Sequence, residues 1–72
     1  MGEKTINIQT PFIRLDALLK FADIAQSGGE AKLIIQEGAV SLNGEVMHVR
    51  GKKCYPGDVV EVSDLRISIA AG

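Results

Sequence analysis

The sequence predicts an α+β fold in which two short helices pack on a small, mostly antiparallel sheet. Three patterns lead to this prediction: apolar residues recur at helical spacing over residues 12–22, a helix-capping pair precedes an apolar stripe over residues 27–38, and short alternating segments lie near both ends. The 72 residues leave room for one hydrophobic core. We therefore expect a single domain over residues 1–72.

The first strand is predicted at residues 5–9, where two isoleucines alternate with polar side chains. Thr10 and Pro11 then suit the cap and the first position of a helix that continues to residue 21 or 22. The apolar stripe of this helix should face the core, which leaves its charged side chains in water: Arg14, Asp16, Lys20 and Asp23.

The second helix is predicted to begin at Ser27, because Ser27 and Glu30 form the sequence pattern of a capping box. It should end at Gly38, since glycine readily adopts the left-handed backbone of a helix C-terminus. Lys32 and Gln36 lie four residues apart and share the outward face. The core side is expected to hold three residues: Ala31, Ile34 and Ile35.

Two glycines in the first turn of this helix have two interpretations. Gly28 and Gly29 would let a phosphate approach the free backbone amides of the helix N-terminus, with Lys32 one turn further on. They would equally suit a tight turn between the two helices. The sequence does not choose between a phosphate site and a turn.

A β-hairpin is predicted at Asn43-Gly44, a dipeptide that accepts the backbone angles of a two-residue turn. That turn places Leu42 opposite Glu45 and defines two sides of the hairpin. One side then carries Val40, Leu42, Met47 and Val49, and the other carries Ser41, Val46, His48 and Arg50. A longer turn would exchange the two sides.

The last third of the chain is predicted to form a basic loop, a turn and two strands. Residues 51–53 form the loop, residues 55–58 the turn, and residues 59–62 the first of these strands. Residues 65–69 alternate again and are expected to pair with the first strand of the chain. Residues 70–72 are expected to form a loose tail.

Composition argues against several functional classes. Eight basic and nine acidic residues give a formal net charge of −1, so binding of polyanions through bulk charge is not expected. His48 and Cys54 are the only residues of their types and have no evident catalytic companion, which argues against an enzyme, a metal site or a cofactor. The single cysteine favours a reducing cytoplasm, and no apolar run is long enough for a membrane span.

Five of the eight cations come from separate segments that folding could bring together: Arg14, Lys32, Arg50, Lys52 and Lys53. A shared patch would provide a local site for nucleic acid. The alternative is that these are scattered charges that keep the protein soluble. The aromatic content of 4% argues against a platform that stacks the bases of a single strand.

The order of these motifs resembles the RNA-binding domain named after small-subunit ribosomal protein S4, also called the alpha-L motif. The resemblance covers residues 14–62 and follows a series of short motifs: Arg14-Leu15-Asp16, Ser27 with Glu30-Ala31-Lys32, Gly38, Val40, Asn43-Gly44, and Gly57-Asp58 with Val60 and Val62. The short, free-standing bacterial members are the most similar, with strands added before and after the motif. One difference is Gly28, where the family usually has arginine. This difference implies that backbone amides or the cations of residues 50–53 take over part of that contact.

The resemblance implies a non-catalytic cytoplasmic protein that binds structured RNA, either ribosomal or transfer RNA, alone or with a protein helper in a ribonucleoprotein. No cofactor, membrane or small-molecule substrate is expected. The residues expected to contact RNA are Arg14, Gly28, Gly29, Lys32, Gln36, Arg50, Lys52 and Lys53, with Asn43 and His48 as secondary candidates. Recognition would depend on the RNA backbone and its shape rather than on base edges.

Two other classes remain open. The chain resembles small sulfur-carrier proteins of the beta-grasp type in its Asn-Gly-Glu-Val hairpin and its Gly-Asp-x-Val-Glu-Val strand, but it ends in Ala71-Gly72 rather than in diglycine. A thiocarboxylate found at its C-terminus would support that class. The other alternative is a protein-interaction module with an acidic partner, whose complexes would survive nuclease treatment.

Overall fold

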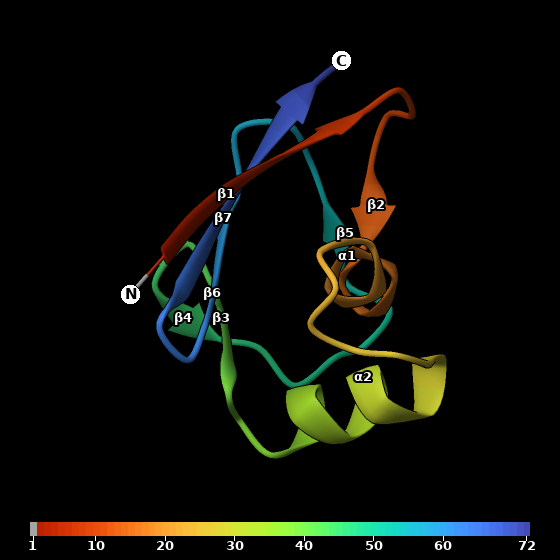
Figure 1. Cartoon of the computed structure of the whole chain (residues 1–72), viewed down its shortest axis with the longest axis vertical. Coiled ribbons are helices and arrows are strands. Elements are labelled where there is room, and N and C mark those ends of the chain that lie inside the picture. Colours follow the sequence, from red (N-terminus) through yellow and green to blue (C-terminus); the bar gives the residue numbers. More distant parts are fainter. Residues whose placement is uncertain (1) are drawn as a thin grey trace.

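A mixed five-stranded sheet faces two helices in the computed structural model, which describes residues 2–72; Met1 lies outside the described residues (Figure 1). The strands of this sheet are, in spatial order, β1 (Gly2–Ile8), β7 (Leu65–Ala71), β6 (Val59–Val62), β3 (Val40–Leu42) and β4 (Glu45–Val46). Strands β1 and β7 are parallel, and the other neighbours are antiparallel. The predicted α+β class and the pairing of the first and last strands are confirmed.

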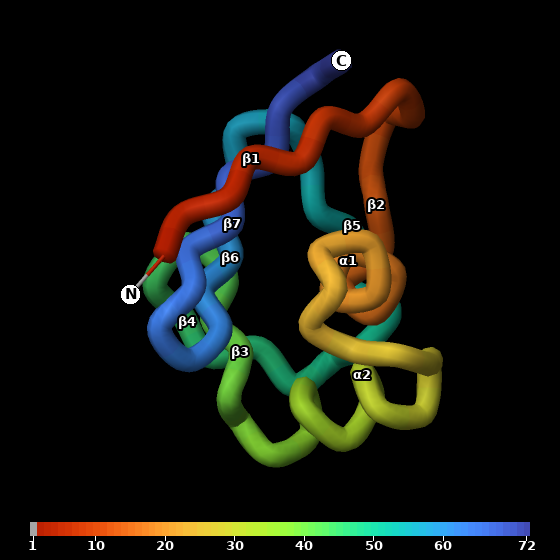
Figure 2. The backbone as a smooth tube through the Cα atoms, viewed as in Figure 1, coloured from red at the N-terminus to blue at the C-terminus, as the bar shows by residue number. Residues whose placement is uncertain are grey.

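Two helices and a short ribbon complete the fold. Helix α1 (Leu15–Phe21) lies beside the sheet and is seen end-on in Figure 1, and helix α2 (Gly28–Gln36) lies below it. Strands β2 (Ile13–Arg14) and β5 (Lys53–Cys54) pair antiparallel in a separate two-stranded ribbon. Figure 2 shows that the chain passes from β1 through this ribbon strand directly into α1.

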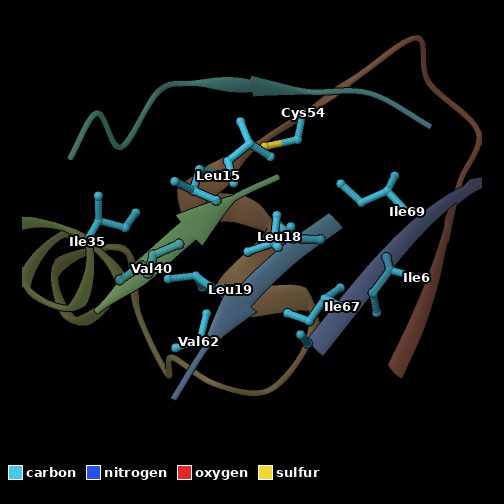
Figure 3. Close-up of a cluster of buried hydrophobic side chains, with 14 of the residues drawn as sticks. Ile6, Leu15, Leu18, Leu19, Ile35, Val40, Cys54, Val62, Ile67 and Ile69 are labelled. Atoms are coloured by element: carbon cyan, nitrogen blue, oxygen red, sulfur yellow. The ribbon is translucent and has the colours of Figure 1, made fainter. Parts of the chain in front are cut away.

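The hydrophobic core fills the space between the sheet and α1 (Figure 3). Leu15, Leu18 and Leu19 of α1 are fully buried, and Ile35 adds a fully buried side chain from α2. Alternate residues of the strands point toward these helices, as the period of two in a strand requires. The buried strand residues are Ile6, Ile8, Val40, Leu42, Val60, Val62, Ile67 and Ile69. The opposite face of the sheet carries mainly polar and charged side chains, together with the exposed Val46.

Helix α1 begins at Leu15, so the prediction of a helix from Pro11 is wrong. Residues 13–14 are extended instead and pair with β5. The amides of Leu15 and Asp16 donate to the carbonyl oxygens of Lys52 and Arg50, at 2.9 and 3.0 Å. These partners come from a segment more than 30 residues away, which local helix signals cannot reveal.

Helix α2 is closed at both ends by local interactions. Ser27 Oγ accepts from the Glu30 amide at 3.2 Å, as the capping box predicts. The Glu30 carboxylate, however, accepts from the Gln26 amide at 2.8 Å rather than from that of Ser27, which corrects the second half of the box. Gly38 has a φ of 80°, and its amide donates to the Ile35 carbonyl, so the predicted left-handed end is confirmed.

The two-residue hairpin is confirmed, because Leu42 pairs with Glu45 and Ser41 with Val46. The register pairs end at Val46, but the Met47 amide still donates to the Val40 carbonyl oxygen at 2.9 Å and Met47 packs against the core, so the predicted alternation holds as far as Met47. Val49 is 59% exposed and does not share the buried side of the hairpin as predicted. Residues after β4 therefore leave the sheet and run toward the start of α1.

The C-terminal residues are ordered by β1, which corrects the prediction of a loose tail. Strand β7 continues to Ala71, two residues beyond the predicted end of the alternation. The Gly72 amide then donates to the Ile8 carbonyl at 2.8 Å. Parallel pairing along all seven residues of β1 holds this segment in place.

Candidate functional site

A buried carboxylate joins two distant segments at the start of α1. Asp16 was expected in water but is only 7% exposed. Its Oδ2 accepts from Arg14 Nη2 and from Arg50 Nε, both at 3.2 Å, and its Oδ1 accepts from the Ala17 amide at 2.8 Å. The prediction of a solvated Asp16 is wrong because the two guanidinium groups and the helix amide replace its water.

The two arginines keep much of their surface in water while Asp16 fixes their position. The side chains of Arg14 and Arg50 are 55% and 42% exposed. Each guanidinium has five N–H donors, and Asp16 occupies one donor of each. The Arg14 guanidinium lies beside Gly51, where a Cβ would be at an ordinary contact distance of 3.6 Å from Arg14 Nη2. The arrangement therefore presents further N–H donors to an external anion.

Arg50 also lies beside the first residue of α2. A Cβ built on Gly28 would lie 3.7 Å from Arg50 Nη2, which is ordinary contact distance. Neither Gly28 nor Gly29 has a positive φ, so the backbone of this turn does not require glycine. Arg50 therefore places a cation beside the first turn of α2.

Lys53 adds a third cation to this region. It lies opposite Arg14 in the ribbon, so both side chains leave the ribbon on the same face. Its Nζ lies 4.9 Å from the centroid of the Phe12 ring. We call Arg14, Arg50 and Lys53 the cationic cluster. Lys53 was predicted in a loop but belongs to β5, where the pairing with β2 fixes its direction.

Of the other main candidates, Gly29, Lys32 and Lys52 lie near this cluster, whereas Gln36 is the last residue of α2, at the end away from Arg50. Lys32 and Gln36 are exposed on α2, with Lys32 one turn beyond Gly28. The Lys52 side chain is exposed, while its carbonyl oxygen accepts from the Leu15 amide. Gly29 is exposed in the first turn of α2. Lys32 and Lys52 can widen the cationic surface along α2 and the loop before β5.

The two secondary candidates lie apart from the cluster. The Asn43 side chain donates to Asp58 Oδ1 at 3.1 Å and accepts from the Val59 amide at 2.9 Å, so it ties the hairpin turn to β6. His48 lies at the far end of α2, where its Nε2 would be 3.3 Å from a Cβ on Gly38. The structure therefore brings together only part of the predicted set.

Sequence reasoning missed Asp16 and Phe12 as parts of this site. The available signal for Asp16 was its place two residues after Arg14, in the first turn of a helix, where a carboxylate is favoured by the free amides. Its pairing with Arg50 depends on tertiary contacts and has no sequence signal. Phe12 was assigned to the apolar stripe of a helix, but it precedes the ribbon instead.

Other chemistry in the described chain is limited. Within residues 2–72, no three His, Cys, Asp or Glu side chains are grouped to hold a metal ion. None of the described helices has the length and apolar character needed to cross a membrane. Burial raises the pKa of the Cys54 thiol to about 11, with a smaller contribution from the Asp58 charge. A thiol with so high a pKa is neutral near pH 7 and a poor nucleophile.

Comparison with known proteins relates this arrangement to one family. Residues 6–70 match the S4 domain. The chain is 49% identical over 57 residues to the "Probable ribosome maturation protein RlbA" of Bacillus subtilis (strain 168), a segment covering 79% of this chain and 80% of that protein. Its structure is similar to the solution structure of YbcJ from E. coli, which reveals an alfaL motif involved in RNA-binding. That similarity has a TM-score of 0.68 and 28% identity, and it covers 96% of this chain and 86% of YbcJ. The resemblance inferred from the sequence is confirmed.

Proposed function

Because the chain belongs to the S4 domain family, we propose that it is a non-catalytic protein that binds structured RNA through the cationic cluster and the adjoining start of α2. The family match includes both helices, the ribbon and all three residues of the cluster. The related YbcJ has a motif involved in RNA-binding. The proposal therefore combines a family property with a specific surface of this chain.

One observation carries the choice of surface: Arg14 and Arg50, from segments far apart in sequence, are held on the single carboxylate of Asp16. Lys53, the register partner of Arg14, adds a third cation beside this pair, so the cluster is positive although the whole chain is not. Partly exposed guanidinium groups in fixed positions can donate hydrogen bonds to the oxygen atoms of phosphates. Such contacts position a protein on the RNA backbone without reading base edges.

Ribosomal RNA is the favoured substrate, and transfer RNA is the alternative. The B. subtilis relative carries the name of a probable ribosome maturation protein, which supports a role in the assembly of ribosomal particles. We place this role in the cytoplasm, with a protein helper or a preformed ribonucleoprotein surface adding to a modest intrinsic affinity. Competition between total ribosomal RNA and total transfer RNA for the purified protein would separate the two substrates.

Charge reversal tests the proposed surface. Lys52→Glu combined with Lys53→Glu should weaken binding to ribosomal RNA by at least tenfold at low salt and flatten the salt dependence, because fewer counterions are released. Lys32→Glu should act in the same direction with a smaller effect. The measurement is a binding titration at several salt concentrations, with thermal unfolding to show that each variant is folded.

Arg66→Glu is the matched control, since Arg66 is an exposed cation of β7 on the other side of the sheet. It changes the net charge in the same direction as Lys32→Glu but lies away from the cluster. Its affinity should stay within about twofold of the unmodified protein. Equal losses in Arg66→Glu and Lys32→Glu, or no loss in the double reversal, would contradict the proposed surface.

A further inference from the structure

The ribbon carries two aromatic rings next to the cationic cluster. Ile13 and Cys54 point to the core, and Cys54 is fully buried. Side chains alternate along a strand, so the flanking residues leave the ribbon on the opposite face. That outward face, which we call the ribbon face, holds Phe12, Arg14, Lys53 and Tyr55. The ribbon face therefore places two cationic and two aromatic side chains next to one another.

The contacts between these side chains confirm this geometry. The ring centroids of Phe12 and Tyr55 are 6.0 Å apart, and their planes are tilted by 52°. Lys53 Nζ lies 4.9 Å from the Phe12 centroid, within the range of a cation–π interaction. Tyr55 remains 48% exposed, and neither ring belongs to the hydrophobic core. Tyr55 therefore has ring surface open to a ligand.

The backbone around both rings is held by short hydrogen bonds. The Tyr55 amide donates to Asp58 Oδ2 at 2.8 Å, and the Asp58 amide donates to the Tyr55 carbonyl at 2.9 Å. Thr10 Oγ1 donates to the Phe12 carbonyl at 2.7 Å. An exposed ring on an ordered backbone loses little conformational entropy when a flat ligand stacks on it.

We propose that the ribbon face binds one unpaired nucleobase of the RNA, which stacks on Tyr55 while Lys53 and Arg14 contact the neighbouring phosphates. This inference rests on the proposed RNA-binding function and adds a structural preference to it. Base–aromatic stacking tolerates any base, because every base has a π-face. Lys53 already lies over the Phe12 ring, so Tyr55 offers a surface for a single base rather than for a strand, which agrees with the low aromatic content of the chain.

Tyr55 provides its own reporter for the test. It is the only tyrosine, and the chain has no tryptophan, so the intrinsic tyrosine fluorescence comes from this site alone. Two RNA hairpins with the same stem are compared, one with a blunt end and one with a single unpaired adenosine at the 3′ end. Their absorbance differs by one nucleotide, so the optical correction is nearly the same for both.

The hairpin with the unpaired adenosine should bind about tenfold more tightly and should quench Tyr55 fluorescence more strongly than the blunt hairpin. Tyr55→Leu should abolish this preference and leave binding of the blunt hairpin within twofold, measured by anisotropy of labelled RNA. Tyr55→Phe should retain the preference, because phenylalanine also stacks. Thermal unfolding establishes that both variants are folded.

The outcomes separate the two proposals. Equal affinity and equal quenching for the two hairpins, with tight binding of both, would overturn the nucleobase site and leave RNA binding standing. Loss of blunt-hairpin binding in Tyr55→Leu, with folding intact, would also overturn it, because the ring would then serve the stem contact. If neither hairpin nor ribosomal RNA binds, the proposed function itself fails.

Discussion

The cationic cluster and the outer face of the five-stranded sheet use the same kinds of charged residue with opposite results. In the cluster, Arg14 and Arg50 share a single buried carboxylate, and Lys53 lies beside Arg14 in the ribbon. On the sheet, Arg66 lies between Glu3 and Glu61, its register partners on the two neighbouring strands. One region therefore has three cations for one carboxylate, and the other has one cation for two.

This difference shows that the net charge of a small protein does not determine how charge is distributed over its surface. Strand pairing alone places the charges of the sheet, and it mixes both signs along one row. The cluster depends on a tertiary junction, in which α1, the loop before β5 and the start of α2 meet. A chain with a formal net charge of −1 can therefore keep a locally positive surface.

The largest expected effect concerns α1, on which both regions depend. Leu18→Ala should lower the free energy of unfolding by about 2 to 5 kcal/mol, because Leu18 is fully buried between the sheet and the helices. Phe21→Ala, in the same helix but at an exposed position, should change it by less than about 0.5 kcal/mol. Urea denaturation measures both, and similar losses would show that the described core is wrong.

The next largest effect compares the loss of stability when one carboxylate is removed from the cluster or from the sheet. Asp16→Ala should destabilise the fold by about 1 to 3 kcal/mol, since it removes two charge-assisted hydrogen bonds and leaves the Ala17 amide without its acceptor. Glu61→Ala, at an exposed carboxylate on the sheet, should cost no more than about 0.5 kcal/mol. If chemical denaturation gives equal values for the two variants, Asp16 does not organise the cluster.

The sequence predicted those features that local chemistry determines. The capped α2 with its glycine end, the Asn43-Gly44 hairpin and the alternation of the first and last strands all depend on neighbouring residues. The start of α1 was misplaced because its first amides bond to carbonyl oxygens of residues 50 and 52. The same junction buries Asp16, so the organisation of the site was missed for the same physical reason.

A smaller effect compares two glycines at opposite ends of α2, of which only Gly28 lies beside the cluster. Gly38→Ala should destabilise the protein by about 1 to 2 kcal/mol, because φ is 80° and a Cβ would approach His48 Nε2. Gly28→Ala should instead stabilise it by up to about 1 kcal/mol, since alanine favours a helix and fits beside Arg50. Thermal unfolding compares them, and a loss in Gly28→Ala would mean that glycine is required there.

The smallest expected effect concerns the buried Cys54 of the ribbon, which changes the free energy of unfolding only at high pH. Because burial raises the pKa of Cys54 to about 11, the unfolded chain loses this proton before the folded one does. The neutral thiol therefore contributes its full stability below about pH 9, and this contribution falls as the pH rises toward 11. Cys54→Ala should lose stability less steeply than the unmodified protein over that range. Chemical denaturation at each pH gives the free energy of unfolding of both proteins. An equal dependence on pH in the two would contradict the burial of the thiol.

The central claim, that RNA contacts the cationic cluster and not the outer sheet face, is tested most directly by nuclear magnetic resonance. Adding ribosomal RNA fragments to the ¹⁵N-labelled protein should shift the amide signals of residues 12–14, 28–32 and 50–55. The signals of Glu3, Glu61 and Arg66 should stay unchanged. Shifts concentrated on the outer sheet face, with the cluster signals unmoved, would contradict the account.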